Sequence, residues 1–165
     1  MHTPADRVFA ADEILTILAD HGVDFVVVGG IAVQAHGYVR GTHDVDIIAR
    51  PTTLNASRLS EALVELEAEL RVPGRLRLTD PHQLARAPLI PLITRAGPLD
   101  VLNIEHVDGG PRSYDTLREA ALKVDLGGRE VAVAGLSDLI RMKRAAGRDQ
   151  DLMDIEALTR EPEST

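Results

Sequence analysis

Two aspartates separated by a single residue, Asp44 and Asp46, are the side chains of this sequence best placed to do chemistry. The apolar run at residues 45–49 predicts a β-strand, and the i, i+2 spacing directs both carboxylates to the same face of it. Two carboxylates held this close repel each other unless a cation lies between them. Because hard oxygen ligands on a rigid strand suit Mg²⁺, the pair predicts a magnesium site.

A glycine pair, Gly29 and Gly30, lies shortly before the aspartates. The β-branched run at residues 24–28 predicts a buried strand that ends at these glycines, and residues 31–36 predict a helix behind them. Glycines have no Cβ, so their backbone N–H groups can approach a ligand closely, and a helix N-terminus favours anions. The strand, turn and helix therefore predict a phosphate-binding turn beside the metal site.

The combined pattern is more specific than its parts, and it resembles the nucleotidyltransferase fold of the DNA polymerase β superfamily. In that fold an aspartate pair follows a strand, a glycine pair and a helix, and here thirteen residues separate Gly30 from Asp44. The stretch Arg40-Gly-Thr42-His-Asp44-Val-Asp46 is similar to the Arg-x-Thr-x-Asp-x-Asp form of minimal bacterial nucleotidyltransferases, among them the AbiE-type toxin–antitoxin group.

The resemblance implies three catalytic carboxylates that also bind metal. Asp44 and Asp46 are two of them, and Asp100, in the apolar stretch 98–102, matches the third, which lies on a later strand in these families. Together they are expected to hold two Mg²⁺ ions, which stabilise the attacking and leaving oxygens of an in-line displacement. Asp100 is also expected to help deprotonate the acceptor hydroxyl.

The resemblance also assigns side chains to the nucleotide, namely Gly29, Gly30, Arg40, Thr42 and Lys143. Lys143 lies in a late helical stretch similar to a family motif in which a lysine and a following Arg-Asp-x-x-Asp cluster face the nucleotide. Asp151 and Asp154 share a helix face, so we expect them to orient Lys143 or a nearby arginine rather than bind metal. By position alone, Thr42 is expected to buttress the strand end, and Arg40 to contact triphosphate or a carboxylate.

The activity that the resemblance implies is Mg²⁺-dependent transfer of a nucleoside monophosphate from a nucleoside triphosphate, such as ATP, to a hydroxyl acceptor. Toxin-like relatives imply a tRNA 3′ end or a protein as acceptor, in a toxin–antitoxin or phage-defence system with a cognate antitoxin. Three alternatives stay open: a minimal antitoxin-type adenylyltransferase of a partner toxin, an aminoglycoside-type transferase, and a catalytically silent nucleotide-binding module.

The composition excludes several other classes of function. The chain has no cysteine, which rules out disulfides, thiolate catalysis and thiolate zinc sites. Its net charge of -8 argues against broad nucleic-acid binding. A tRNA acceptor would require a local cluster of the arginines at positions 71, 75, 77, 141, 144 and 148. No run approaches the roughly 18 apolar residues of a membrane span, and the N-terminus has no signal pattern, so we expect a cytoplasmic protein without a membrane partner.

The order of predicted elements indicates an α/β protein of the α+β type, with a mixed, mainly antiparallel sheet, flanking helices and a short helical C-terminus. We expect one nucleotidyltransferase domain at residues 1–160 and a flexible tail at 161–165. Since aromatic residues make up only 2% of the chain, the core must be aliphatic. The predicted helices are a first helix capped by Thr3 and Pro4 with one apolar face, and further helices at 53–70, at 114–122 and after a cap at Ser137. The predicted strands are one at 75–79, a pair at 89–94 and 99–105, and a hairpin across Gly127 and Gly128.

Overall fold

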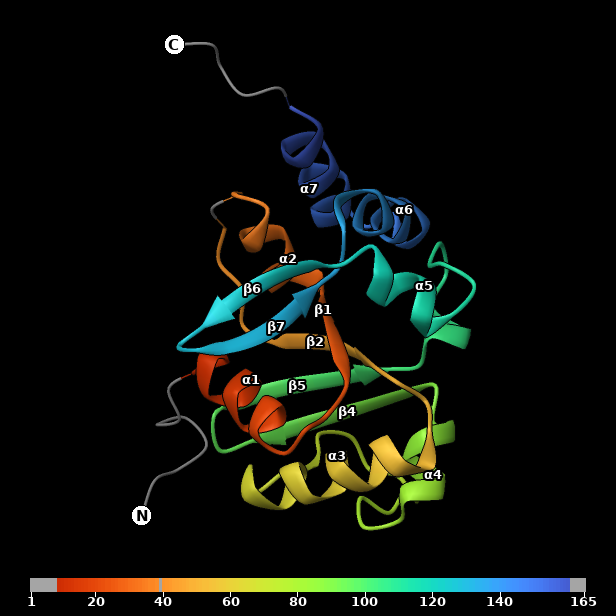
Figure 1. Ribbon diagram of the computed structural model, residues 1–165. Coiled ribbons are helices and arrows are strands. Elements are labelled where there is room, and N and C mark those ends of the chain that lie inside the picture. Colours follow the sequence, from red (N-terminus) through yellow and green to blue (C-terminus); the bar gives the residue numbers. More distant parts are fainter. Residues whose placement is uncertain (1–8, 39, 161–165) are drawn as a thin grey trace.

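The computed structural model describes residues 9–38 and 40–160, and a seven-stranded sheet forms its centre (Figure 1). The strands are β1 (Phe25–Val28), β2 (Val45–Ala49), β3 (Glu69–Leu70), β4 (Leu89–Thr94), β5 (Gly97–Leu102), β6 (Leu122–Leu126) and β7 (Arg129–Val133). Their order in the sheet is β3-β4-β5-β2-β1-β7-β6. The pairs β1–β7 and β2–β5 are parallel and the other neighbours are antiparallel, which confirms the predicted mixed, mainly antiparallel sheet.

Helices flank this sheet and form the C-terminal part of the described chain. They are α1 (Ala11–Asp20), α2 (Gly29–Ala35), α3 (Thr53–Glu65), α4 (Pro81–Arg86), α5 (Tyr114–Glu119), α6 (Leu136–Ala146), α7 (Asp149–Thr159) and the short 3-10 helix η2 (Ile104–His106). In Figure 1, α3 and α4 lie below the sheet, and α6 and α7 lie above it. Helix α2 contacts β1, β2 and α6, so the glycine pair lies where the sheet meets the C-terminal helices.

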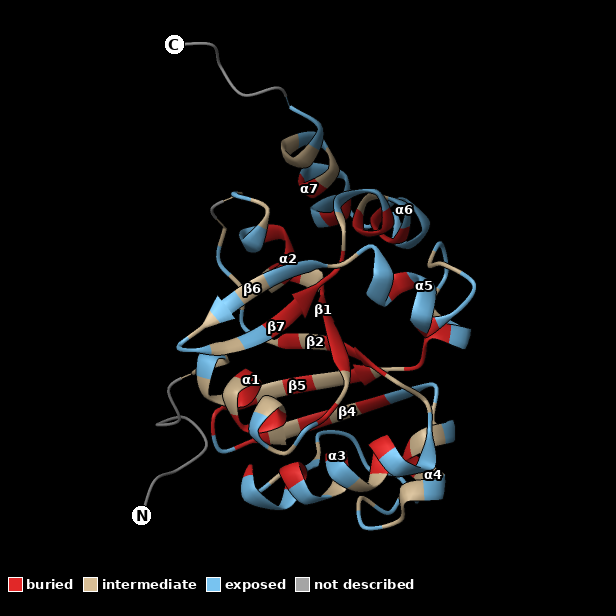
Figure 2. Cartoon of the chain, in the orientation of Figure 1, coloured by how far each residue is buried: buried red, intermediate tan, exposed pale blue. Residues whose placement is uncertain are grey.

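The core is aliphatic, as the composition predicts. Buried residues line the central strands (Figure 2), and all four residues of β1 are buried. Among the buried apolar residues of the described chain, only Phe25 and Tyr114 are aromatic. No helix within the described ranges combines the length and apolar character needed to cross a lipid bilayer.

The first helix and the two C-terminal helices follow their sequence patterns with small shifts. Helix α1 buries the predicted apolar face but begins at Ala11, and the predicted cap at Thr3 and Pro4 lies outside the described residues. Gly147 ends α6 in the left-handed conformation, with φ 64°. Ser137 is not the N-cap of α6, because the helix already begins at Leu136. The predicted tail at 161–165 also lies outside the described residues.

Two predictions around α3 are wrong. The helix predicted at 53–70 ends at Glu65, and residues 69–70 form β3, which pairs with β4. The strand predicted at 75–79 does not form, because β3 already occupies that edge of β4. Residues 75–79 instead bond to helices, since Ser60 Oγ donates to Leu78 O and the Arg77 N–H donates to Gln83 Oε1.

Two boundaries further along the chain also differ from prediction. Strand β5 ends at Leu102, and a 3-10 turn replaces the predicted continuation of the strand to residue 105. Helix α5 ends at Glu119 rather than at 122, because Leu122 joins β6 and pairs with Val133. The hairpin predicted across Gly127 and Gly128 is confirmed.

Asn55 connects α3 to the sheet, and its replacement is expected to destabilise the fold. Its side chain is buried, accepts a hydrogen bond from the Asp24 N–H and donates to the carbonyls of Asp24 and Arg50. Asn55→Ala leaves these buried backbone groups without partners and should lower the free energy of unfolding by about 2–3 kcal/mol. Denaturant unfolding measures the change, with the exposed Thr53→Ala on the same helix as control. A loss below about 0.5 kcal/mol would contradict this role.

Candidate active site

Three aspartates meet where β2 and β5 lie side by side. Asp46 on β2 is the register partner of Asp100 on β5, and Asp44 immediately precedes β2. One carboxylate oxygen from each residue lies within 4.8 Å of the other two. This is the one group of at least three potential metal ligands in the described part of the chain, and its donors are all hard oxygens suited to Mg²⁺. The structure thus brings together the three residues predicted to bind metal.

The three carboxylates carry more negative charge than their surroundings neutralise. Burial raises the pKa of Asp46 to about 7, and the neighbouring charges of Asp44 and Asp100 add to this effect. The positive charge of Lys143 acts in the opposite direction. A divalent cation would relieve this repulsion, so the electrostatics of the residues present fit a metal site.

The raised pKa of Asp46 predicts how stability depends on pH without metal. Below about pH 4, the ordinary carboxyl pKa, Asp46 is protonated in both the folded and the unfolded protein. Between about pH 4 and 7, Asp46 retains its proton in the folded protein but loses it in the unfolded protein. Stability should therefore fall as the pH rises from 4 towards 7 through this group. Melting curves in EDTA should show the fall, and Asp46→Asn should remove most of it. An equal fall in the Asn variant would assign the effect to other groups.

The glycine pair makes room for the chain's own site residues. Gly29 has φ +69°, and a Cβ there would lie 2.2 Å from Asp46 Oδ2. A Cβ on Gly30 would lie 2.7 Å from Arg40 Nη2 and 2.8 Å from Thr42 Oγ1. The glycines are therefore needed because an aspartate, an arginine and a threonine pack directly on the turn. Helix α2 also begins at Gly29, two residues earlier than predicted.

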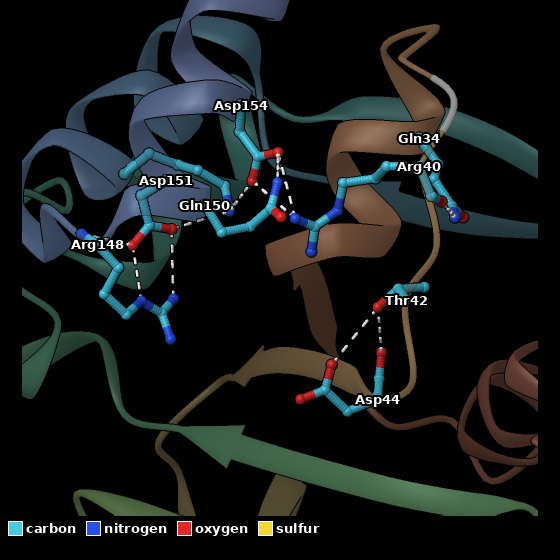
Figure 3. A network of polar contacts seen from close by, with 9 residues as sticks. Gln34, Arg40, Thr42, Asp44, Arg148, Gln150, Asp151 and Asp154 are labelled. Atoms are coloured by element: carbon cyan, nitrogen blue, oxygen red, sulfur yellow. Dashed lines mark hydrogen bonds and ion pairs between the residues drawn. The ribbon is translucent and has the colours of Figure 1, made fainter.

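The loop before β2 is held at both ends. Gln34 Nε2 donates to Arg40 O at 2.5 Å, and Thr42 Oγ1 donates to Asp44 O at 3.2 Å. Figure 3 shows Thr42 above Asp44 and Arg40 extended towards α7. Thr42 thus buttresses the strand end, as its position predicts.

An ionic cluster centred on the buried Lys143, Asp151 and Asp154 joins α6, α7 and this loop (Figure 3). Lys143 Nζ lies 2.9 Å from Asp154 Oδ2 and 3.3 Å from Asp151 Oδ1. Arg40 Nη1 reaches the same Asp154 at 3.1 Å, so this fully buried carboxylate joins two cations. Arg148 pairs with Asp151 at 2.7 Å. Burial alone would raise the pKa of Asp151, but hydrogen bonds from Arg148 and Lys143 hold it below its usual range. The two aspartates contact cations, as predicted.

Two hollows open beside the three carboxylates. The first, of about 500 Å³, is lined by the glycine pair, the three aspartates, Lys143 and Arg148, and by an apolar wall that includes Val107, Leu139 and Met142. The second, of about 580 Å³, is mainly polar and is lined by Thr42, His43, Arg71 and Pro98. Arg40, Asp44 and Gln150 border both hollows. Each predicted site residue except Thr42 therefore lines the first hollow, and Thr42 lines the second.

Sequence reasoning missed one residue at the carboxylates. Arg71 Nη2 lies 2.7 Å from Asp100 Oδ1, whereas the sequence indicated Arg71 only as one of six arginines that a tRNA acceptor would require. No local pattern marks this contact, because it depends on the pairing of β3 with β4.

The fold is shared with solved nucleotidyltransferases. The lincosamide antibiotic adenylyltransferase LnuA, in its lincomycin-bound form, is 15% identical with a TM-score of 0.63, over 92% of this chain and 97% of that one. The antibiotic-resistance factor ANT(2'')-Ia is 12% identical in sequence, with a TM-score of 0.58. The match covers 88% of this chain and 78% of ANT(2'')-Ia. A structure described as a putative nucleotidyltransferase from Thermotoga maritima is 15% identical in sequence, with a TM-score of 0.54. The match covers 94% of this chain and 97% of that protein.

The sequence itself identifies the family. No curated protein matches the sequence. A family model described as "Nucleotidyltransferase of unknown function (DUF6036)" matches residues 6–159, which is nearly the whole chain. The geometry of the carboxylates, the shared fold and this match lead to one conclusion: the chain belongs to this family of nucleotidyltransferases, transferases of the EC 2.7.7 type.

Proposed function

We propose that the protein is a Mg²⁺-dependent nucleotidyltransferase that moves a nucleoside monophosphate from a nucleoside triphosphate, such as ATP, to a hydroxyl acceptor. The observation that carries this proposal is the meeting of Asp44, Asp46 and Asp100 within 4.8 Å, in a hollow that is also lined by the buried Lys143. A catalytically silent module would have no need to retain three mutually repelling carboxylates.

The three aspartates would hold two Mg²⁺ ions in this account. When bound, the ions supply positive charge to the attacking and leaving oxygens of the displacement. Without metal, burial raises the pKa of Asp46, and the charges of Asp44 and Asp100 add to this effect.

The triphosphate would lie in the first hollow, beside Gly29 and Gly30. Lys143 is fixed by Asp151 and Asp154, and Arg40 is fixed by Asp154, so both cations are held in place before a ligand arrives. Preorganised charges of this kind stabilise transferring phosphoryl groups because they need no rearrangement during the reaction. Thr42 would support the site by fixing Asp44.

The transfer step forms one bond and breaks one. The acceptor oxygen bonds to the α-phosphorus, the bond from that phosphorus to the bridging oxygen breaks, and pyrophosphate leaves. Asp100 takes the acceptor proton in this proposal, since it pairs with Arg71, and Arg71 lines the second hollow.

The charge distribution favours a protein or small-molecule acceptor over a tRNA 3′ end. Of the six arginines that a tRNA would require, three already pair with aspartates: Arg71 with Asp100, Arg141 with Asp138 and Arg148 with Asp151. These ion pairs lower the net positive charge that the surface presents to a polyanion such as tRNA, and the chain already has a net charge of -8. LnuA is described as an antibiotic adenylyltransferase, which supports a small-molecule hydroxyl as the second candidate. The toxin–antitoxin setting, with a cognate toxin or antitoxin, and the cytoplasmic location stay predictions.

Incubation with α-³²P-labelled ATP, CTP, GTP or UTP tests the proposal. The protein and Mg²⁺ are mixed separately with total tRNA, a bacterial protein extract, lincomycin or tobramycin, and Asp46→Asn serves as the control. We expect label to move to one acceptor class with release of pyrophosphate, only in the wild type. Label on tRNA would overturn our preference for the acceptor, and the absence of transfer and pyrophosphate release in every mixture would overturn the proposed reaction.

A further inference from the structure

Arg71 lies in the same row of the sheet as the catalytic carboxylates. The Arg71 N–H donates to Pro91 O on β4, Pro91 is the register partner of Asp100 on β5, and Asp100 is the partner of Asp46 on β2. Residues in one row of a sheet project to the same face. Arg71 therefore approaches Asp100 from the side opposite Asp46.

The guanidinium of Arg71 is held at two points. Nη1 donates to the carbonyl of Leu92 at 2.9 Å, and Nη2 donates to Asp100 Oδ1 at 2.7 Å. The Asp100 side chain is 16% exposed and that of Arg71 is 39% exposed, so the pair lies at the boundary between the site and solvent. A planar guanidinium that is anchored twice fixes the orientation of its carboxylate partner.

The pair also connects the two hollows. Asp100 lines the first hollow and Arg71 lines the second. If the triphosphate fills the first hollow, the second hollow offers a separate approach to Asp44. An acceptor hydroxyl that enters through the second hollow meets Arg71, which lies next to Asp100, the carboxylate proposed to take the hydroxyl proton.

We propose, on the basis of the proposed function, that Arg71 is a positioning residue which orients Asp100 from the acceptor side and competes with the metal for its Oδ1. Two opposing consequences follow from this placement. Removing the cation leaves more negative charge for a divalent ion, which tightens metal binding. Removing the anchor lets the Asp100 carboxylate rotate, which slows the reaction because catalysis depends on its orientation.

The experiment compares Arg71→Gln, Arg71→Lys and Arg75→Gln with the wild type. Arg75 lies on the same loop, is exposed, and makes no hydrogen bond or ion pair with the described residues, so its variant gives a matched charge control. Binding of Mn²⁺ to the nucleotide-free protein is measured by electron paramagnetic resonance. Pyrophosphate release from ATP is measured with the acceptor that the wild type labels, or with water if it labels none.

We expect Arg71→Gln to bind Mn²⁺ about threefold or more tightly and to release pyrophosphate about tenfold more slowly. Arg71→Lys should bind Mn²⁺ like the wild type but react more slowly, because an ammonium group lacks the fork that spans Leu92 and Asp100. Arg75→Gln should match the wild type in both measurements.

Two results would overturn the role of Arg71 alone. One is an Arg71→Gln variant that equals the wild type in both measurements. The other is a variant that loses Mn²⁺ affinity, activity and melting temperature together, which marks a purely structural residue. If the wild type neither binds Mn²⁺ nor releases pyrophosphate, the proposed function fails, and this inference fails with it.

Discussion

Replacing Asp46 with asparagine is expected to slow nucleotidyl transfer about a thousandfold or more, which corresponds to about 4 kcal/mol of barrier. Asp46 occupies the centre of the cluster, between Val28 on β1 and Asp100 on β5. Asparagine retains the shape of the side chain but removes the charge that a metal ion requires. The loss should appear in the rate of label transfer at saturating nucleotide.

The same substitution should stabilise the metal-free protein. Above pH 7 the Asp46 carboxylate is ionised and partly buried beside two others, and the neutral amide removes that repulsion. We expect a gain of about 1–2 kcal/mol in the free energy of unfolding in EDTA. Asp12→Asn, an exposed site without a side-chain partner in the described residues, should change neither rate nor stability appreciably. An Asp46→Asn variant that loses both activity and stability would contradict this account of the cluster.

The substitution Asp154→Ala should have the largest effect on stability. The carboxylate is fully buried and neutralises Lys143 and Arg40, whose side chains are only 7% and 19% exposed. Removing one partner of a buried ion pair typically costs about 3–5 kcal/mol, because the remaining charge has neither water nor a counterion. Lys143 retains Asp151, so we expect a loss of about 3 kcal/mol in denaturant unfolding.

This substitution should also affect nucleotide binding. Without Asp154 the orientation of Arg40 is no longer fixed, so affinity for a nonhydrolysable ATP analogue should fall in the fraction that remains folded. Asp149 lies in the first turn of the same helix but is exposed. The control Asp149→Ala should therefore lower the free energy of unfolding by only a few tenths of a kcal/mol. A loss of similar size in both variants would show that the helix, and not the buried pairing, carries the effect.

Local sequence patterns were sufficient to predict the centre of the fold. The β-branched run before Gly29 forms a buried strand, and the spacing of Asp44 and Asp46 places both carboxylates near Asp100. These are short-range properties, because strand alternation and turn chemistry depend on adjacent residues. The resemblance supplied Asp100, which composition and spacing alone did not identify.

Long-range pairing decided the features that the sequence did not reveal. Residues 69–70 continue a helical pattern, yet they pair with β4 because the sheet offers a free edge there. That pairing brings Arg71 to Asp100. The absence of a Cβ at Gly29 and Gly30 also makes room for Asp46 and Arg40, and the sequence did not reveal these contacts. Such contacts cross many residues of sequence, and no local periodicity encodes them.

Anomalous diffraction from crystals grown with Mn²⁺ and the ATP analogue AMPCPP tests the central claim most directly. We expect anomalous density between Asp44, Asp46 and Asp100, with the triphosphate beside Gly29 and Gly30 in the first hollow. Anomalous density at other carboxylates, or a bound nucleotide with no metal at these three aspartates, would contradict the account.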